Sequence, residues 1–160
     1  METKYIIITL LLTIGSISIQ AQNSTDIFNK FSDNEDITTV FISKALLQLA
    51  SEMNGDMGGA NISNLISKLT QIEIYTTEKE SVAQMMKKES DKFINNKTYE
   101  SLMKIRDKGD NVDFLIQRNK DRIDELLMVV SDGEECTIIR IAGDFTMEDI
   151  QKVMSDNKGK

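Results

Sequence analysis

Four runs typical of β-strands follow one another in the second half of the chain, separated only by short segments of turn-forming residues. They cover residues 99–106, 112–118, 125–130 and 136–142. The separators are rich in Gly, Asp and Asn, which are common in tight turns, and short turns join neighbouring strands into antiparallel hairpins. The order predicts a four-stranded β-meander, which constrains the fold more than any other feature of the sequence.

Apolar residues are distributed differently over these four runs. Residues 126–130 and 138–141 are apolar on both faces, whereas the first two runs each have one apolar face. Strands buried on both sides read as continuous apolar runs, so the last two strands are expected at the centre of a sheet. In the run 99–106, alternation predicts that Tyr99, Met103 and Ile105 share one face.

The first half of the chain alternates between strand-like and helix-like patterns. Residues 37–43 and 71–76 are rich in β-branched and aromatic residues and are predicted strands. Residues 44–53 predict a helix whose inner face is formed by Ala45, Leu46, Leu49 and Met53. Further helices are expected from about residue 25, over residues 62–69, over residues 77–94 and after Thr146.

Two helix starts carry the pattern of a capping box, in which a hydroxyl and a carboxylate three residues apart bind each other's backbone amides. Thr77 with Glu80 predicts one, and Thr146 with Asp149 predicts the other. With the strand assignments, these elements predict an α+β two-layer sandwich. Its mostly antiparallel sheet has about six strands, ends in the four-stranded meander and carries helices on one face.

The first residues of the chain have the order of a secretory signal peptide. Lys4 precedes an apolar run over residues 5–12, and small and polar residues follow as far as Ala21. We expect a signal peptide over residues 1–22 with cleavage near Ala21, and a periplasmic or secreted protein; an uncleaved N-terminal anchor is the alternative. A lipoprotein would need a cysteine at the cleavage site, and Cys136 lies far downstream. The mature chain is then one α+β domain over residues 23–155 with a polar tail at 156–160.

The residue types argue against most kinds of catalysis. The chain has no histidine and one cysteine, Cys136, which lies in an apolar strand and is expected in the core. The acidic segments 33–36 and 132–135 lack the ligand spacing of a calcium loop. The glycines at Gly55, Gly58 and Gly59 do not have the spacing of a phosphate-binding loop. We therefore expect no enzyme activity, no catalytic or metal-binding residues, and no cofactor.

The net charge is −7, which disfavours binding to nucleic acid and to anionic lipid headgroups because both require clustered Lys and Arg. No membrane span is expected after signal cleavage. The expected partner is an unknown protein or small molecule, and the expected oligomeric state is a monomer or a weak homodimer.

Three phrases of the sequence together resemble one family. They are residues 37–44 ahead of a helix, the pair Tyr99-Glu100 ahead of Leu102-Met103, and residues 123–130 followed by 138–143. In these phrases the mature chain resembles the DUF4252 family, which is found mainly in Bacteroidetes and has no assigned function. Its members usually begin with an export or lipoprotein signal, so the resemblance implies an exported protein and transfers no catalytic residue.

The leading hypothesis is a non-catalytic envelope protein that binds a partner through its sheet or through the glycine-rich segment 54–59. One alternative is a hydrolase that uses the paired carboxylates of Asp107 and Asp110, although a solvated turn does not shift two carboxyl pKa values apart. A second alternative is an assembly protein that pairs through the exposed edge of the strand 99–106.

Overall fold

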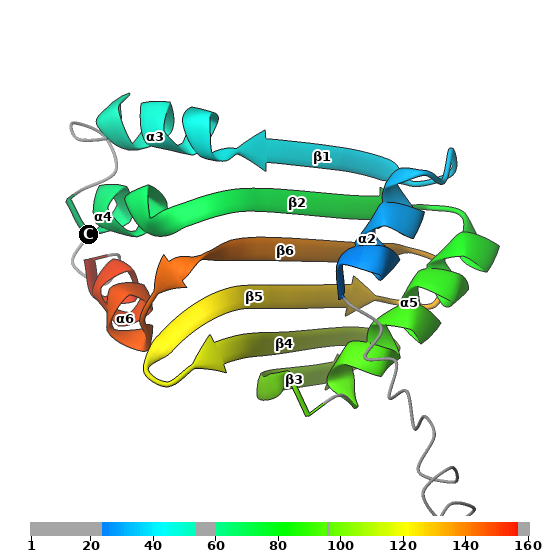
Figure 1. Ribbon diagram of the computed structural model, residues 1–160. Helices are drawn as coiled ribbons and strands as arrows, with labels where there is room; N and C mark the ends of the chain where they lie inside the picture. The colour runs from blue at the N-terminus through cyan, green and yellow to red at the C-terminus, as the bar shows by residue number, and fades with distance from the viewer. Residues whose placement is uncertain (1–23, 54–59, 96, 157–160) are drawn as a thin grey trace, which may run out of the picture.

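The computed structural model describes residues 24–53, 60–95 and 97–156 (Figure 1). The expected signal peptide, the glycine-rich segment 54–59 and most of the polar tail lie outside the described residues. Within the described ranges, no helix is both long enough and apolar enough to cross a membrane.

A six-stranded antiparallel sheet forms the framework, as the sequence predicts (Figure 1). The spatial order is β1-β2-β6-β5-β4-β3, so the last four strands form the expected meander and β5 and β6 occupy the two central places. The strands are β1 (Thr38–Ser43), β2 (Leu69–Thr77), β3 (Glu100–Asp107), β4 (Asp110–Asn119), β5 (Arg122–Ser131) and β6 (Cys136–Phe145).

Tight turns hold the meander together. At the β3–β4 hairpin, Lys108 and Gly109 both have positive φ, of 46° and 111°. Two successive residues in this conformation make the turn whose twist matches the twist of the paired strands. The turn residues that separate the strands in the sequence therefore have the conformations that a hairpin requires.

Five helices lie in the described residues, in two groups (Figure 1). Helices α2 (Ser24–Ser32) and α5 (Glu80–Ile94) lie on one face of the sheet, which we call the covered face. Helices α3 (Lys44–Met53), α4 (Ala60–Lys68) and α6 (Met147–Asp156) gather at one end of the sheet. The predicted placement of helices on one face of the sheet thus holds for α2 and α5, whereas α3, α4 and α6 cap one end of the sheet.

The two groups of helices produce two cores. On the covered face, aromatic residues dominate: the Phe28 ring stacks on Tyr75 at 5.4 Å and on Phe93 at 5.4 Å, and Phe31 is fully buried beside them. The second core lies under α3, α4 and α6, where Leu47 and Phe145 pack with apolar side chains from the other face of the sheet. Besides Phe145, the strand side chains in this second core are Ile42, Leu69, Ile72, Ile116, Ile123, Leu126 and Ile141.

One of the two predicted capping boxes is wrong. Helix α5 begins only at Glu80, and its N-cap residue, Lys79, makes no side-chain cap hydrogen bond. Thr77 is the last residue of β2; its hydroxyl donates to the carbonyl of Asp36 and accepts from the amide of Lys79. Strand pairing therefore extends through the residue that the pattern assigned to the helix.

The second capping box is confirmed. The amide of Asp149 donates to Oγ1 of Thr146 at 3.2 Å, and the amide of Thr146 donates to Oδ2 of Asp149 at 2.8 Å. This reciprocal pair begins α6, and Lys68 of α4 contacts the same carboxylate at 2.6 Å.

The predicted inner face of α3 is also wrong, although its limits agree with the sequence prediction. Leu47 of α3 is buried, at 5% exposure. Leu46 and Leu49 are each 52% exposed, and Ala45 is exposed too. An apolar stripe that the periodicity placed in the core lies on the surface.

The predicted common face of Tyr99, Met103 and Ile105 does not exist. The β3–β4 register shifts between Ser101 and Met103, which is the effect of a β-bulge. The additional residue reverses the alternation, because side chains on a strand change face at every residue. Tyr99, just before β3, is therefore buried on the covered face, whereas Met103 and Ile105 lie on the opposite face.

Candidate binding surface

A buried ionic cluster lies on the covered face. Arg140 of β6 donates from Nε to Oε2 of Glu125 at 2.7 Å and from Nη1 to Oε2 of Glu73 at 2.9 Å. The hydroxyl of Tyr99 donates to the other oxygen of Glu125, and the Phe28 ring lies 4.8 Å from the guanidinium carbon. The three charged side chains are 14% exposed or less.

The electrostatics of this cluster favour a structural role. Burial opposes the charge on Arg140, but hydrogen bonds to Glu125 and Glu73 outweigh it and raise the pKa of Arg140. Burial, reinforced by the charge of Glu73, raises the pKa of Tyr75 to about 12. Tyr75 therefore stays protonated at neutral pH, and each charge of the cluster binds a group of opposite charge.

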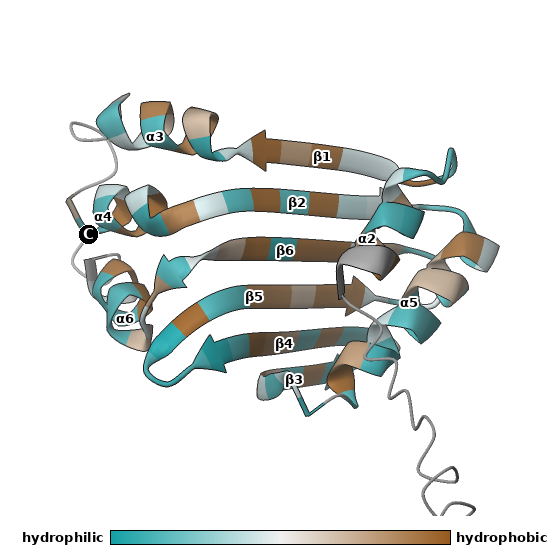
Figure 2. Ribbon diagram, in the orientation of Figure 1, coloured by the Kyte–Doolittle hydropathy of each residue, from teal (hydrophilic) through white to brown (hydrophobic). Residues whose placement is uncertain are grey.

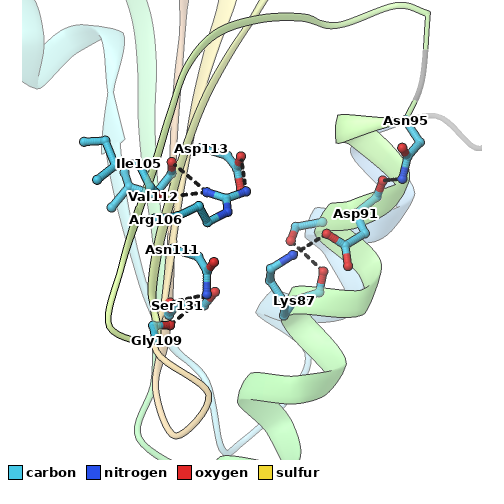
Figure 3. A network of polar contacts seen from close by, with 11 residues as sticks. Lys87, Asp91, Asn95, Ile105, Arg106, Gly109, Asn111, Val112, Asp113 and Ser131 are labelled. Carbon is cyan, nitrogen blue, oxygen red and sulfur yellow. Dashed lines mark hydrogen bonds and ion pairs between the residues drawn. The ribbon is translucent and has the colours of Figure 1, made fainter.

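A cleft of about 440 Å³ lies between α5 and the turns at one end of the meander (Figure 3). Several of its polar groups bind partners within the protein. Lys87 pairs with Asp91, and Asn111 donates to the carbonyls of Gly109 at 2.8 Å and Ser131 at 3.4 Å. The Asn111 amide thus joins the turn at Gly109 to the end of β5 at Ser131.

Arg106 and Asp113 form a second pair beside this cleft, between neighbouring strands (Figure 3). Two guanidinium–carboxylate hydrogen bonds of 2.7 and 2.9 Å join them. The Asp113 side chain is fully buried and the Arg106 side chain is 46% exposed. Arg106 therefore covers a carboxylate that would otherwise be buried without a partner.

The paired carboxylates suggested by the sequence are adjacent but solvated. Asp107 and Asp110 are register partners at the β3–β4 turn, and both are exposed. A general acid and base need a sheltered site that separates their pKa values. The geometry therefore does not favour them as a catalytic pair.

The structure also shows the surroundings of the cysteine and of the second acidic segment that the sequence analysis considered. Cys136 is 1% exposed, and burial raises the pKa of its thiol to about 11, which favours the unreactive thiol form. In the acidic turn that begins at Asp132, the carboxylate of Asp132 accepts the amides of Glu134 and Glu135. Among the described residues, no group of three or more potential metal ligands lies together.

The face of the sheet opposite α2 and α5 carries a continuous apolar row. Register partners lie side by side on the same face, and one residue from each strand forms a line across the whole sheet. The two ends of this line, at the outer strands, are 44% and 46% exposed. The row is Val40, Ile74, Ile139, Met128, Phe114 and Met103.

A second row beside the first is equally free of charge. The hydroxyls of two of its residues, Thr76 and Thr137, form a hydrogen bond of 2.8 Å across β2 and β6. The row is Thr38, Thr76, Thr137, Val130, Val112 and Ile105. We call these two rows the open face, and Figure 2 shows the apolar stretches of the strands in brown.

The open face ends where the second core begins. The next row along the strands, from Ile42 to Ile116, packs under α3, α4 and α6. On the opposite side of the same strands, residues such as Leu127, Val129 and Ile138 are fully buried beneath α2 and α5. The central strands thus have a buried apolar side and a partly exposed apolar side.

Sequence reasoning missed the ionic cluster and part of the open face. Arg140 lies in the run 138–141, which the sequence analysis treats as apolar on both faces. A charged residue between Ile139 and Ile141 was the available signal of a buried ionic group. The open face was visible as the two-sided apolar pattern of β5 and β6, but that pattern did not show which side lacks a helix.

Comparison with known families agrees with the resemblance of the sequence. Residues 31–153, more than half of the chain, match DUF4252, a domain of unknown function. The chain belongs to this family. No curated protein and no solved structure matches it.

Proposed function

We propose that this DUF4252 protein is a non-catalytic binding module, whose open face receives the apolar stripe of an amphipathic helix from a partner protein. The observation that supports this is the pair of uncharged rows that cross all six strands. In a chain in which 28% of the residues are charged, an uncharged sheet face of this extent indicates contact with another apolar surface.

The dimensions of the open face favour a helix as its occupant. Six strands at a spacing of about 4.8 Å extend over about 24 Å between the outer strands. A helix of about 16 residues has that length, at 1.5 Å per residue. The two rows lie about 7 Å apart. With their side chains they are about as wide as one helix, whose diameter is about 10–12 Å.

The architecture and the charge support the same occupant. A sheet that is apolar on both sides is stable when each side is covered by another layer, and α2 and α5 cover only one. The net charge of −7 favours a partner helix whose polar face is basic. The open face is a broad sheet surface and small-molecule sites are concave, so a protein partner fits better than a metabolite.

Binding of a synthetic peptide tests the proposal. The probe is a helical peptide of about 16 leucine and lysine residues with leucines on one stripe, and its control has the same composition with the stripe scrambled. We expect calorimetry to detect binding of the striped peptide and little binding of the scrambled one. Equal binding of the two peptides would contradict a specific helix site.

Variants locate the binding on the protein. Met128→Gln and Ile139→Gln change the middle of the open face, and each should weaken binding at least about tenfold, or 1.4 kcal/mol. Leu49→Gln is the matched control, because Leu49 is an exposed apolar residue on α3, outside the open face. Loss of binding in the control alone would move the site away from the open face.

We also propose that the protein is exported and that it is cleaved near Ala21. The support is the apolar run 5–12 after Lys4 and the small and polar residues that follow. Mass spectrometry of the protein from the native cell envelope should give Gln22 or Asn23 as the first residue. An intact N-terminal segment in the envelope fraction would show that the segment is retained as an anchor.

A further inference from the structure

The two edges of the sheet differ in their protection against pairing. The outer strand β3 carries a bulge between Ser101 and Met103 and four charged residues: Glu100, Lys104, Arg106 and Asp107. Bulges and charged side chains are the common devices that prevent an edge from adding another strand. The other outer strand, β1, has no charged residue and pairs with β2 without a register shift.

Exposed apolar side chains gather along the same edge. Val40 and Phe41 of β1 are 44% and 59% exposed, and Leu46 and Leu49 of α3 follow them in the chain at 52% each. We call these four residues the apolar edge. Figure 1 shows that α3 continues directly from the end of β1, along the margin of the sheet.

The charges that flank β1 are of opposite sign. The exposed acidic residues Asp33, Glu35 and Asp36 precede the strand, and the exposed Lys44 follows it. A strand with this charge order is complementary to itself when two copies run antiparallel, because each acidic end then meets a basic end. In a parallel arrangement the like charges would meet.

We propose that a second copy of this chain binds at β1, antiparallel and about a two-fold axis, to form one continuous sheet of twelve strands. Residues that share a face must lie opposite each other. With Val40 opposite its symmetry mate, Ile42 lies opposite Thr38, and Lys44 lies opposite Asp36. The pairing satisfies the outward backbone groups of β1 and joins the open faces of the two copies into one surface.

This inference goes beyond the proposed function and does not depend on it. Pairing at β1 requires no helix partner, and helix binding on the open face requires no second copy. The two are tested by separate measurements, since self-association is measured without the peptide.

Analytical ultracentrifugation of the protein purified from cells that express the full chain tests the inference. We expect a monomer–dimer equilibrium between about 10 μM and 1 mM. Val40→Lys should weaken the dimer at least about tenfold, because it places two like charges opposite each other at the axis. A wild-type protein that remains monomeric over this range would overturn the inference.

Met103→Lys is the matched control. Met103 lies at the opposite end of the same row, with 46% exposure against 44% for Val40, and its substitution should leave the dimer unchanged. Equal weakening by both substitutions would indicate stacking of open faces, and weakening by Met103→Lys alone would indicate pairing at β3; either result overturns pairing at β1. Circular dichroism confirms that each variant is folded.

A mixing experiment tests the antiparallel direction. Lys44→Glu and Asp36→Lys should each weaken the homodimer at least about threefold, because each brings like charges together at both ends of the interface. In an equimolar mixture of the two variants, both ends again carry opposite charges, so the mixed dimer should recover wild-type affinity. Failure of the mixture to recover would overturn the antiparallel arrangement.

Discussion

Replacing Arg140 by Met should cost a large fraction of the stability of the domain. The substitution keeps a long apolar side chain but removes the cation between Glu73 and Glu125. These carboxylates are 14% and 6% exposed. Removing one partner of a buried ion pair costs about 3–5 kcal/mol, because the remaining charge stays buried without compensation.

Urea unfolding measures this loss. With an m-value of about 2 kcal/mol/M, a loss of about 4 kcal/mol lowers the midpoint by about 2 M. The total stability of a domain is about 5–15 kcal/mol, so a marginal protein would lose most of its folded population. Far-UV circular dichroism follows the transition, and an unchanged m-value shows that the folded and unfolded states remain comparable.

A triple variant separates the ionic explanation from a packing defect. Glu73→Gln, Glu125→Gln and Arg140→Met together remove all three charges at nearly constant volume. Because replacing a complete buried ionic group by neutral residues is often close to neutral, the triple variant should recover at least about half of the lost midpoint.

An exposed pair provides the control. Arg118 binds Glu100 through two hydrogen bonds of 2.8 and 2.6 Å, but these side chains are 40% and 53% exposed. Arg118→Met should leave the midpoint close to that of the wild type, since water compensates exposed charges. If Arg140→Met behaves like Arg118→Met, or if the triple variant is no more stable than Arg140→Met, the reasoning is refuted.

Three further predictions concern other parts of the fold. A hydrogen bond from Lys68, and to a smaller extent those from Thr146, lower the pKa of Asp149 to about 2. The ionised carboxylate should therefore add about 1–2 kcal/mol to the free energy of unfolding above pH 4, and this contribution should disappear as the pH falls towards 2. In urea unfolding, the stability difference between wild type and Asp149→Asn should shrink over that pH range. A side chain at Gly143 would place a Cβ 2.6 Å from the carbonyl oxygen of Lys68, so Gly143→Ala should lower the free energy of unfolding by about 1–3 kcal/mol. The thiol of Cys136, buried and with its pKa raised to about 11, should react with iodoacetamide at pH 8 only after unfolding, and mass spectrometry that detects rapid alkylation of the folded protein would contradict its burial.

The strands were predictable from the sequence because two local signals coincide there. Period-two alternation marks the first two runs of the meander, continuous apolar residues mark the last two, and turn residues with special backbone conformations separate the runs. Lys108 and Gly109 have the positive φ angles that such a turn needs. The central places of β5 and β6 followed from their apolar residues on both faces.

Features that depend on distant contacts were not predictable. The bulge in β3 is a property of its pairing with β4, and one additional residue was enough to move Tyr99 to the covered face. The buried face of α3 depends on where α4 and α6 pack; periodicity located the stripe of Leu46 and Leu49 but not the side that faces the protein.

The ionic cluster escaped prediction for a related reason. Glu73, Glu125 and Arg140 come from three strands, and the register of the sheet brings them together. Each alone resembles a solvated residue on an alternating strand. Burial becomes visible only when Phe28 of α2 covers the guanidinium, and no local pattern encodes that contact.

The open face and the apolar edge share one physical origin. Apolar side chains on a strand lower the free energy only when something covers them, and the helices of this chain cover one side of the sheet and one end of the other. Val40 belongs to both uncovered regions: it is the end of the first row of the open face, and it is part of the unprotected strand β1. Pairing of two copies at β1 would bury the edge at Val40 and double the length of the row. The surface offered to a partner helix would then be continuous across the dimer, so two helices bound along the row would lie end to end and would meet at the two-fold axis.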